Sequence, residues 1–238
     1  MKGTSLTRRT DHRTHRVRIL LICEGEKTEP HYFEEFWAEY RHPNVEVCAL
    51  HGDHTDPQNL VTFGQDIFLY GGDNGHGKKM LPRAFDEVYI LFDRDEHPRY
   101  ATAIQAAKDL EPSLRNDFRK PIVFRALPSN PCFELWLVLH YRDVLHLPHR
   151  DDLFHDLKQR WNGYDKGATG LFAKTKDLLP DACTRATRLN AGSSPYHEEK
   201  GYAGVLPLVK RLQHLHQKYT QESARATSPE GRRPAGRR

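Results

Sequence analysis

Short apolar runs alternate with longer segments of helical spacing along the first 140 residues. The runs are mostly free of polar groups, which is typical of strands buried on both faces of a parallel sheet. They predict four strands, over Val17–Cys23, Val45–Leu50, Val88–Phe92 and Ile122–Phe124. The segments between them predict helices that start at Thr28 or Glu29 and that cover residues 56–69 and 100–110. This alternation predicts an α/β fold, with a mostly parallel Rossmann-like sheet flanked by helices.

The pattern changes after the fourth strand. Asn130-Pro131 predicts a helix start, because Asn is a favoured cap and Pro is tolerated in the first turn. This helix is almost wholly apolar through His140, so we expect it to be buried. Later segments are helical in spacing, with little strand signal, and predict helices over residues 151–161, 171–179, 181–190 and 205–219. We therefore divide the chain into a disordered basic tail, an α/β domain, a helical appendage and a second disordered basic tail, over residues 1–16, 17–145, 146–219 and 220–238.

One segment comes close to a phosphate-binding P-loop. Residues 71–79 read GGDNGHGKK, with two glycines and a lysine at the required spacing. Lys79 stands where Ser or Thr would reach the magnesium ion, and Pro82 follows too soon for the expected helix. A mobile, basic surface loop is the better interpretation.

The net charge of +4 is unevenly distributed. Residues 1–18 contribute +5 and residues 221–238 contribute +3, which leaves −4 for the body between them. Such a body with basic tails suits a metal site in a protein that meets polyanions, although the tails can equally serve solubility alone. The sequence shows no apolar stretch of membrane length and no signal-peptide pattern, and its four cysteines lack zinc or redox spacing. We therefore expect a cytoplasmic protein with reduced thiols and no membrane partner.

Acidic residues directly follow two predicted strands. Glu24 follows the first strand, and Asp93 and Asp95 follow the third. Ligand sites of open α/β sheets lie beyond such strand ends, so we expect the three carboxylates to lie side by side. In an extended chain Asp93 and Asp95 point the same way and would repel each other unless a cation joined them. Oxygen ligands favour Mg²⁺ or Mn²⁺, which act on phosphorus centres, and Lys27 is placed to hold the phosphate.

Glu134 lies in the first turn of the predicted apolar helix. A buried carboxylate needs a partner, which a metal or a lysine would supply. The alternative is an exposed glutamate that the helix dipole stabilises at the edge.

Four motifs together resemble the RloB family. They are CEGEKTEP-x-YF, FDRDEHP, SNPCFELWLVLH and YDKG, which begin at Cys23, Phe92, Ser129 and Tyr164. Proteins of this family look like members of the Toprim superfamily, whose fold is shared by bacterial primases, topoisomerases and OLD-family nucleases. The resemblance implies that Glu24 is the catalytic glutamate, as general acid/base or metal ligand, and that Asp93 and Asp95 bind the metal. Further candidates are Lys27 as a catalytic cation, and Glu29, Asn130 and Glu134 as an additional site.

RloB genes occur near restriction–modification loci and are associated with phage defence. The resemblance therefore implies a Mg²⁺-dependent nuclease that cleaves DNA or RNA, transfer RNA included, during infection. Other proteins of a defence locus are its implied partners, beside nucleic acid. Two alternatives stay open: a non-cleaving nucleic-acid-binding or regulatory module, and nucleotidyl transfer as in primases. Residues 191–208 depart from the family pattern, so we predict no function for the last helix.

Overall fold

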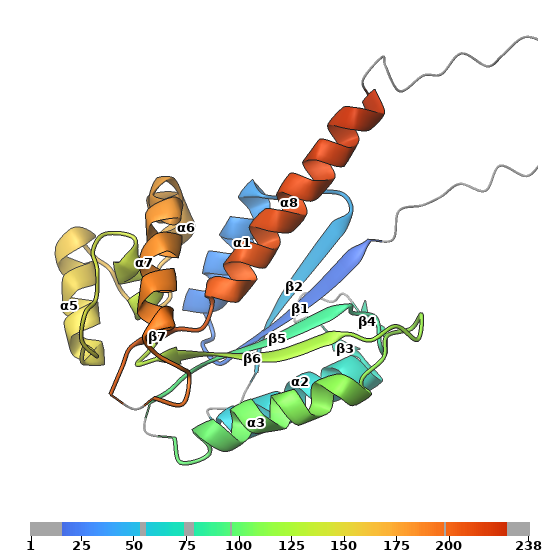
Figure 1. Ribbon diagram of the computed structural model, residues 1–238, viewed down its shortest axis with the longest axis horizontal. Coiled ribbons are helices and arrows are strands. Elements are labelled where there is room, and N and C mark those ends of the chain that lie inside the picture. The colour runs from blue at the N-terminus through green and yellow to red at the C-terminus, as the bar shows by residue number, and fades with distance from the viewer. Residues whose placement is uncertain (1–15, 53–55, 74–78, 96, 198, 228–238) are drawn as a thin grey trace, which may run out of the picture.

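The computed structural model describes residues 16–52, 56–73, 79–95, 97–197 and 199–227. It shows a mixed α/β fold built on one five-stranded sheet (Figure 1). The strand order is β2-β1-β5-β6-β7, and β7 alone is antiparallel to its neighbour. The bounds of these strands are Val45–His51 for β2, Val17–Cys23 for β1, Glu87–Asp93 for β5, Val123–Asn130 for β6 and Tyr202–Ala203 for β7. The predicted fold class is confirmed.

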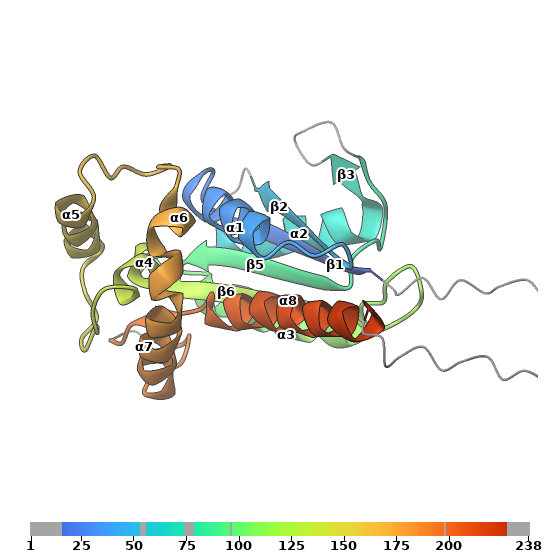
Figure 2. The same ribbon diagram turned by 90° about the horizontal axis from the view of Figure 1, so that it is seen from above.

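Helices cover both faces of the sheet and one of its ends. One face carries α2 (Pro57–Tyr70) and α3 (Tyr100–Leu110), and the other carries α1 (Thr28–Glu39) and α8 (Leu206–Thr227) (Figure 1). Beyond the carboxyl ends of the strands gather α4 (Glu134–Leu139), α5 (Arg150–Arg160), α6 (Leu171–Thr175) and α7 (Leu179–Ala191) (Figures 1 and 2). The smaller elements are the hairpin of β3 (Gly72–Asp73) and β4 (Lys79–Met80), and 3-10 turns at Glu111–Ser113 and Lys176–Leu178. None of the helices in these described ranges is long and apolar enough to cross a membrane.

The apolar run of β1 reflects burial on both faces of the sheet. Successive side chains of a strand point to opposite faces. Ile19 and Leu21 join the core under α1 and α8, whereas Leu20 and Ile22 join the core under α2 and α3. All four are 0% exposed, so no position in this stretch tolerates a polar side chain without a partner.

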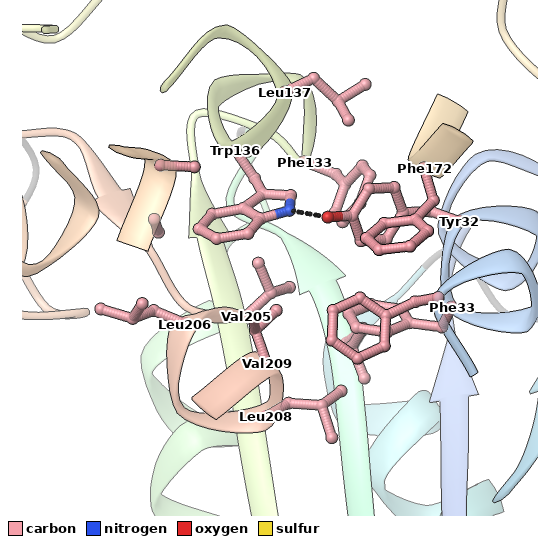
Figure 3. Packing of buried hydrophobic residues seen from close by; sticks show 14 of the residues in the cluster. Tyr32, Phe33, Phe133, Trp136, Leu137, Phe172, Val205, Leu206, Leu208 and Val209 are labelled. Atoms are coloured by element: carbon pink, nitrogen blue, oxygen red, sulfur yellow. Dashed lines mark hydrogen bonds between the residues drawn. The ribbon is translucent and has the colours of Figure 1, made fainter. Parts of the chain in front are cut away.

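A cluster of aromatic side chains packs α1, which covers the sheet, against the segments that lie beyond the strand ends (Figure 3). The ring of Tyr32 in α1 meets the rings of Phe133 and Phe172 edge to face, with centroids 5.5 Å apart in both pairs. The indole Nε1 of Trp136 donates a hydrogen bond of 2.9 Å to the Tyr32 hydroxyl. The same core includes Leu212 of α8, so residues on both sides of the predicted boundary at 145 contribute to it. The boundary itself stays a prediction.

The predicted helix start at Asn130 is wrong. Asn130 is the last residue of β6, a cis peptide bond joins it to Pro131, and α4 begins only at Glu134. The strand extends this far because β6 pairs with β5 up to Ser129 and with β7 at its last two residues. Pro128 is tolerated because β6 lacks a ladder with β7 at that position. Cap chemistry alone did not reveal this long-range pairing.

Other differences concern short elements and ends. The two-residue strand β7 has no periodicity by which a sequence could show it. The predicted helix at residues 171–179 divides into α6 and a 3-10 turn before α7 begins. Because α8 extends to Thr227, residues 220–227 are helical instead of a disordered tail. The predictions for residues 1–15, 74–78 and 228–238 lie outside the described residues.

Candidate functional site

The site lies where the strand order changes direction. β1 has β2 on one side and β5 on the other, which makes the crevice beyond β1 and β5 the topological switch point of the sheet. Glu24 directly follows β1, and its N–H donates to the carbonyl of Leu91 at 2.9 Å. Its Oε2 accepts a hydrogen bond of 2.9 Å from the N–H of Asp93. The prediction that these two strand ends are neighbours is confirmed.

A cavity of about 380 Å³ opens at this point. Its lining is strongly acidic, with six carboxylates and three cationic side chains. The carboxylates are Glu24, Glu26, Glu29, Asp93, Asp95 and Glu134, and the cations are Lys27, Arg150 and Lys166. The excess of anions makes the cavity a place where a further cation is stabilised.

The chain is not extended at Asp95, so the extended geometry expected after β5 is wrong. Asp95 has a φ of +35°, in the left-handed region, and turns the chain after β5. Asp93 turns towards the start of α4, where its Oδ1 accepts a hydrogen bond of 2.9 Å from the N–H of Phe133. The result is two groups of ligand atoms, each within 4.8 Å, formed by Glu24, Asp95 and His97 and by Asp93, Cys132 and Glu134.

Arg150 connects the two groups. Its Nη1 donates a short hydrogen bond to Oδ1 of Asp95, and its Nη2 lies 3.7 Å from Oδ2 of Asp93. Arg150 is the first residue of α5, so a helix beyond the sheet brings this cation to the strand ends. On the other side His97 places its Nε2 3.6 Å from Oε1 of Glu24.

Glu29 projects over Gly25. A Cβ built on Gly25 would lie 2.1 Å from Oε2 of Glu29, so glycine leaves the space that this carboxylate occupies. Glu29 is only 5% exposed. Burial raises the pKa of its carboxyl to about 7, with contributions from Glu134 and Glu24 and against a hydrogen bond from its own backbone.

Burial is also the largest influence on the pKa values of Asp93 and Glu24, the carboxyls at the two strand ends. It raises the pKa of Asp93 well above its usual value, and the charges of Glu29, Glu134 and Glu24 raise it further. It raises the pKa of Glu24 too, outweighing the hydrogen bond from the N–H of Asp93. Desolvation and like charges both disfavour the ionised forms, and a bound cation would relieve both.

Glu134 is 3% exposed at the start of α4, so the alternative of an exposed glutamate is wrong. The partner present in the structure is the hydroxyl of Tyr164, which donates to its Oε1 at 3.3 Å. Tyr164 belongs to the YDKG motif, whose Lys166 and Gly167 line the cavity. The sequence pointed to this motif only as part of the family resemblance, with no role assigned to its residues.

The end of the same motif supports Lys27. The N–H of Gly167 donates to Oγ1 of Thr28 at 3.2 Å. A Cβ on Gly167 would lie 2.7 Å from Cδ of Lys27, and its φ is +88°. Glycine is therefore required here both by the backbone and by the close approach of the lysine stem.

Asn130 is outside the residues that line the cavity. Its Nδ2 donates to the carbonyls of His197 and Lys200 at 3.0 and 2.8 Å, which holds the segment before β7. Of the predicted site residues, Asn130 therefore lies outside the cavity lining. The others all line the cavity: Glu24, Lys27, Glu29, Asp93, Asp95 and Glu134. The residues that sequence reasoning missed are His97, Lys166 and Arg150. The first two lie inside the quoted motifs, whereas no local signal marks Arg150.

The donor set fits a hard divalent cation. Glu24, Asp93 and Asp95 offer carboxylate oxygens from two adjacent strand ends, and these are the ligands that Mg²⁺ and Mn²⁺ prefer. Burial raises the pKa of both Glu24 and Asp93, so a bound cation would stabilise their ionised forms.

Comparison with known proteins identifies the family. Searches of curated proteins and of solved structures gave no match. The model of the family described as RloB-like protein matches residues 19–212, which include most of β1, the cavity and the first seven residues of α8. The chain therefore belongs to the RloB-like protein family.

Proposed function

We propose that the protein is a Mg²⁺- or Mn²⁺-dependent nuclease of Toprim type, which hydrolyses phosphodiester bonds of DNA or RNA. The observation that carries the proposal is that Glu24, Asp93 and Asp95 line one cavity at the switch point of the sheet, together with cationic side chains. Metal-assisted hydrolysis of a phosphodiester uses carboxylates that hold the metal and cations that stabilise the phosphate.

Each side chain has a part in this proposal. Glu24, Asp93 and Asp95 would hold the divalent ion, which when bound neutralises charge on the phosphate. Glu24 is partly buried with a raised pKa, so it is suited to exchange a proton with the attacking water or the leaving oxygen. Lys27 and Lys166, from two neighbouring segments of the cavity lining, would orient the phosphate.

Family membership supports a role in anti-phage defence, in the cytoplasm, with other proteins of a defence locus as partners. Nucleotidyl transfer is not favoured, because nothing in the cavity lining distinguishes a nucleoside triphosphate from a polynucleotide phosphate. The non-cleaving binding module is kept as an outcome of the experiment.

The experiment compares four substrates and four variants. Purified protein is incubated with Mg²⁺ or Mn²⁺ and separate pools of plasmid, single-stranded DNA, messenger RNA and transfer RNA. Glu24→Gln, Asp93→Asn and Asp95→Asn should each lower the cleavage rate at least about 100-fold while circular dichroism shows a folded chain. Asp151→Asn is the matched control, because Asp151 lies on α5 with 81% of its side chain exposed. This variant should cleave the substrates at the wild-type rate.

Full activity in the three site variants would refute the proposal. Salt-dependent binding of nucleic acid without products under either metal would instead favour the non-cleaving module.

A further inference from the structure

We propose that Arg150 is a phosphate-binding residue that, in the ion-free protein, takes the place of the divalent cation between Asp93 and Asp95. When the cation binds, the guanidinium leaves the carboxylates and turns to the substrate phosphate. This inference rests on the proposed function and deepens it, because it gives one side chain opposite effects on metal affinity and on cleavage.

The contacts of Arg150 show that it neutralises the metal-ligand candidates. One nitrogen of its guanidinium bonds Asp95, and the other lies 3.7 Å from Asp93. The two aspartates belong to different groups of ligand atoms, so Arg150 occupies the junction that a shared cation would fill. A guanidinium and a metal ion cannot both sit against the same oxygens, and the two cations therefore compete.

The Arg150 side chain has the freedom to change its position and the chemistry to bind phosphate. It keeps 29% of its surface exposed, at the wall of the cavity and on a flexible arm. A guanidinium presents a planar fork of donors that matches two phosphate oxygens, which makes it a strong phosphate ligand. Lys27 and Lys166 line the same cavity, so a phosphate that enters it meets cations from three segments of the chain.

The competing explanation is that Arg150 only clamps α5 to the sheet. The packing of α5 argues against that role. Leu153 and Leu157 are both 0% exposed and join the main core, so apolar contacts already hold the helix. Ion pairs that keep contact with solvent, as those of Arg150 do, contribute little to stability. Holding α5 against the sheet is therefore not the main role of Arg150.

The test measures Mn²⁺ binding directly, by electron paramagnetic resonance or calorimetry, in the absence of nucleic acid and at one ionic strength. Arg150→Gln should bind Mn²⁺ about tenfold more tightly than the wild type, which is roughly 1.4 kcal/mol. In the cleavage assay the same variant should be at least about tenfold slower, with Arg150→Lys in between. Arg160→Gln is the matched control: it removes one positive charge from the same helix, where Arg160 pairs with Asp156, and should change neither quantity.

The outcomes separate the two proposals. Wild-type binding of Mn²⁺ with unchanged or weaker binding by Arg150→Gln would overturn the role of Arg150 and leave the nuclease proposal standing. A strong fall in thermal stability of Arg150→Gln with unchanged Mn²⁺ affinity would assign the side chain to the clamp. No Mn²⁺ binding by the wild type would overturn both proposals.

Discussion

Neutralising Glu29 should stabilise the ion-free protein at neutral and alkaline pH but much less in acid. Burial raises the pKa of this carboxyl to about 7 in the folded protein, whereas an unfolded chain has about 4.3. Below the lower value the carboxyl is protonated in both states, and no stability is lost. As the pH rises through 7, the folded protein must ionise a buried group beside Glu134 and Glu24, so stability falls. The difference corresponds to roughly 3–4 kcal/mol at pH 8.

The assay is urea unfolding in the presence of EDTA, followed by the fluorescence of the three tryptophans. Wild type and Glu29→Gln are compared at pH 5 and at pH 8. The variant should be more stable by at most about 1 kcal/mol at pH 5 and by roughly 3–4 kcal/mol at pH 8. In thermal unfolding the gain at pH 8 corresponds to roughly 10 °C for a chain of this size.

Glu26→Gln is the control for this prediction. It removes the same charge from the same cavity, but 72% of the Glu26 side chain is exposed. Its free energy of unfolding should stay within about 0.5 kcal/mol of the wild type at both pH values. An equal gain for Glu29→Gln at pH 5 and pH 8, or a loss at pH 8, would refute the raised pKa.

Two further predictions concern the support of the site. Gly167→Ala should cost roughly 1–2 kcal/mol of stability, because its φ is +88°, and should also weaken substrate binding, because its Cβ would meet Lys27. Gly163→Ala, at a φ of +80° with nothing within 4 Å, should show the backbone cost alone in the same unfolding and cleavage assays; an equal loss of substrate affinity would contradict the contact. Tyr32→Phe should lower the free energy of unfolding by about 1–3 kcal/mol, because it leaves the buried indole N–H of Trp136 without its acceptor. Unfolding at an unchanged urea concentration would show that the indole has another partner.

Features that depend on local burial could be predicted from the sequence. The run of β1 and the helix at residues 100–110 were placed within a residue of their observed bounds, because a strand buried on both faces and an amphipathic helix each leave a periodic signature. The position of Glu24 next to Asp93 followed from the parallel order of the strands, since their carboxyl ends meet at one edge.

Features that depend on long-range contacts could not be predicted from the sequence. Arg150 lies 55 residues from Asp95, and nothing near it in the sequence distinguishes it from other arginines. The turn at Asp95 was missed because a left-handed aspartate has no pattern that separates it from an extended one. The end of β6 was missed because cap chemistry at Asn130 competed with pairing to Tyr202 of β7, which is distant in the sequence.

The composition of the cavity has a consequence for how the protein is made. All six lining carboxylates come from residues 24–134, whereas two of the three lining cations come from residues 150 and 166. Synthesis from the N-terminus therefore delivers the anionic part of the site before most of its cationic part. A chain that stops before α5 carries the carboxylates with Lys27 as the remaining cation of this described lining. Under the proposed function, the groups that would hold the cation are therefore synthesised before most of the groups that would bind the phosphate.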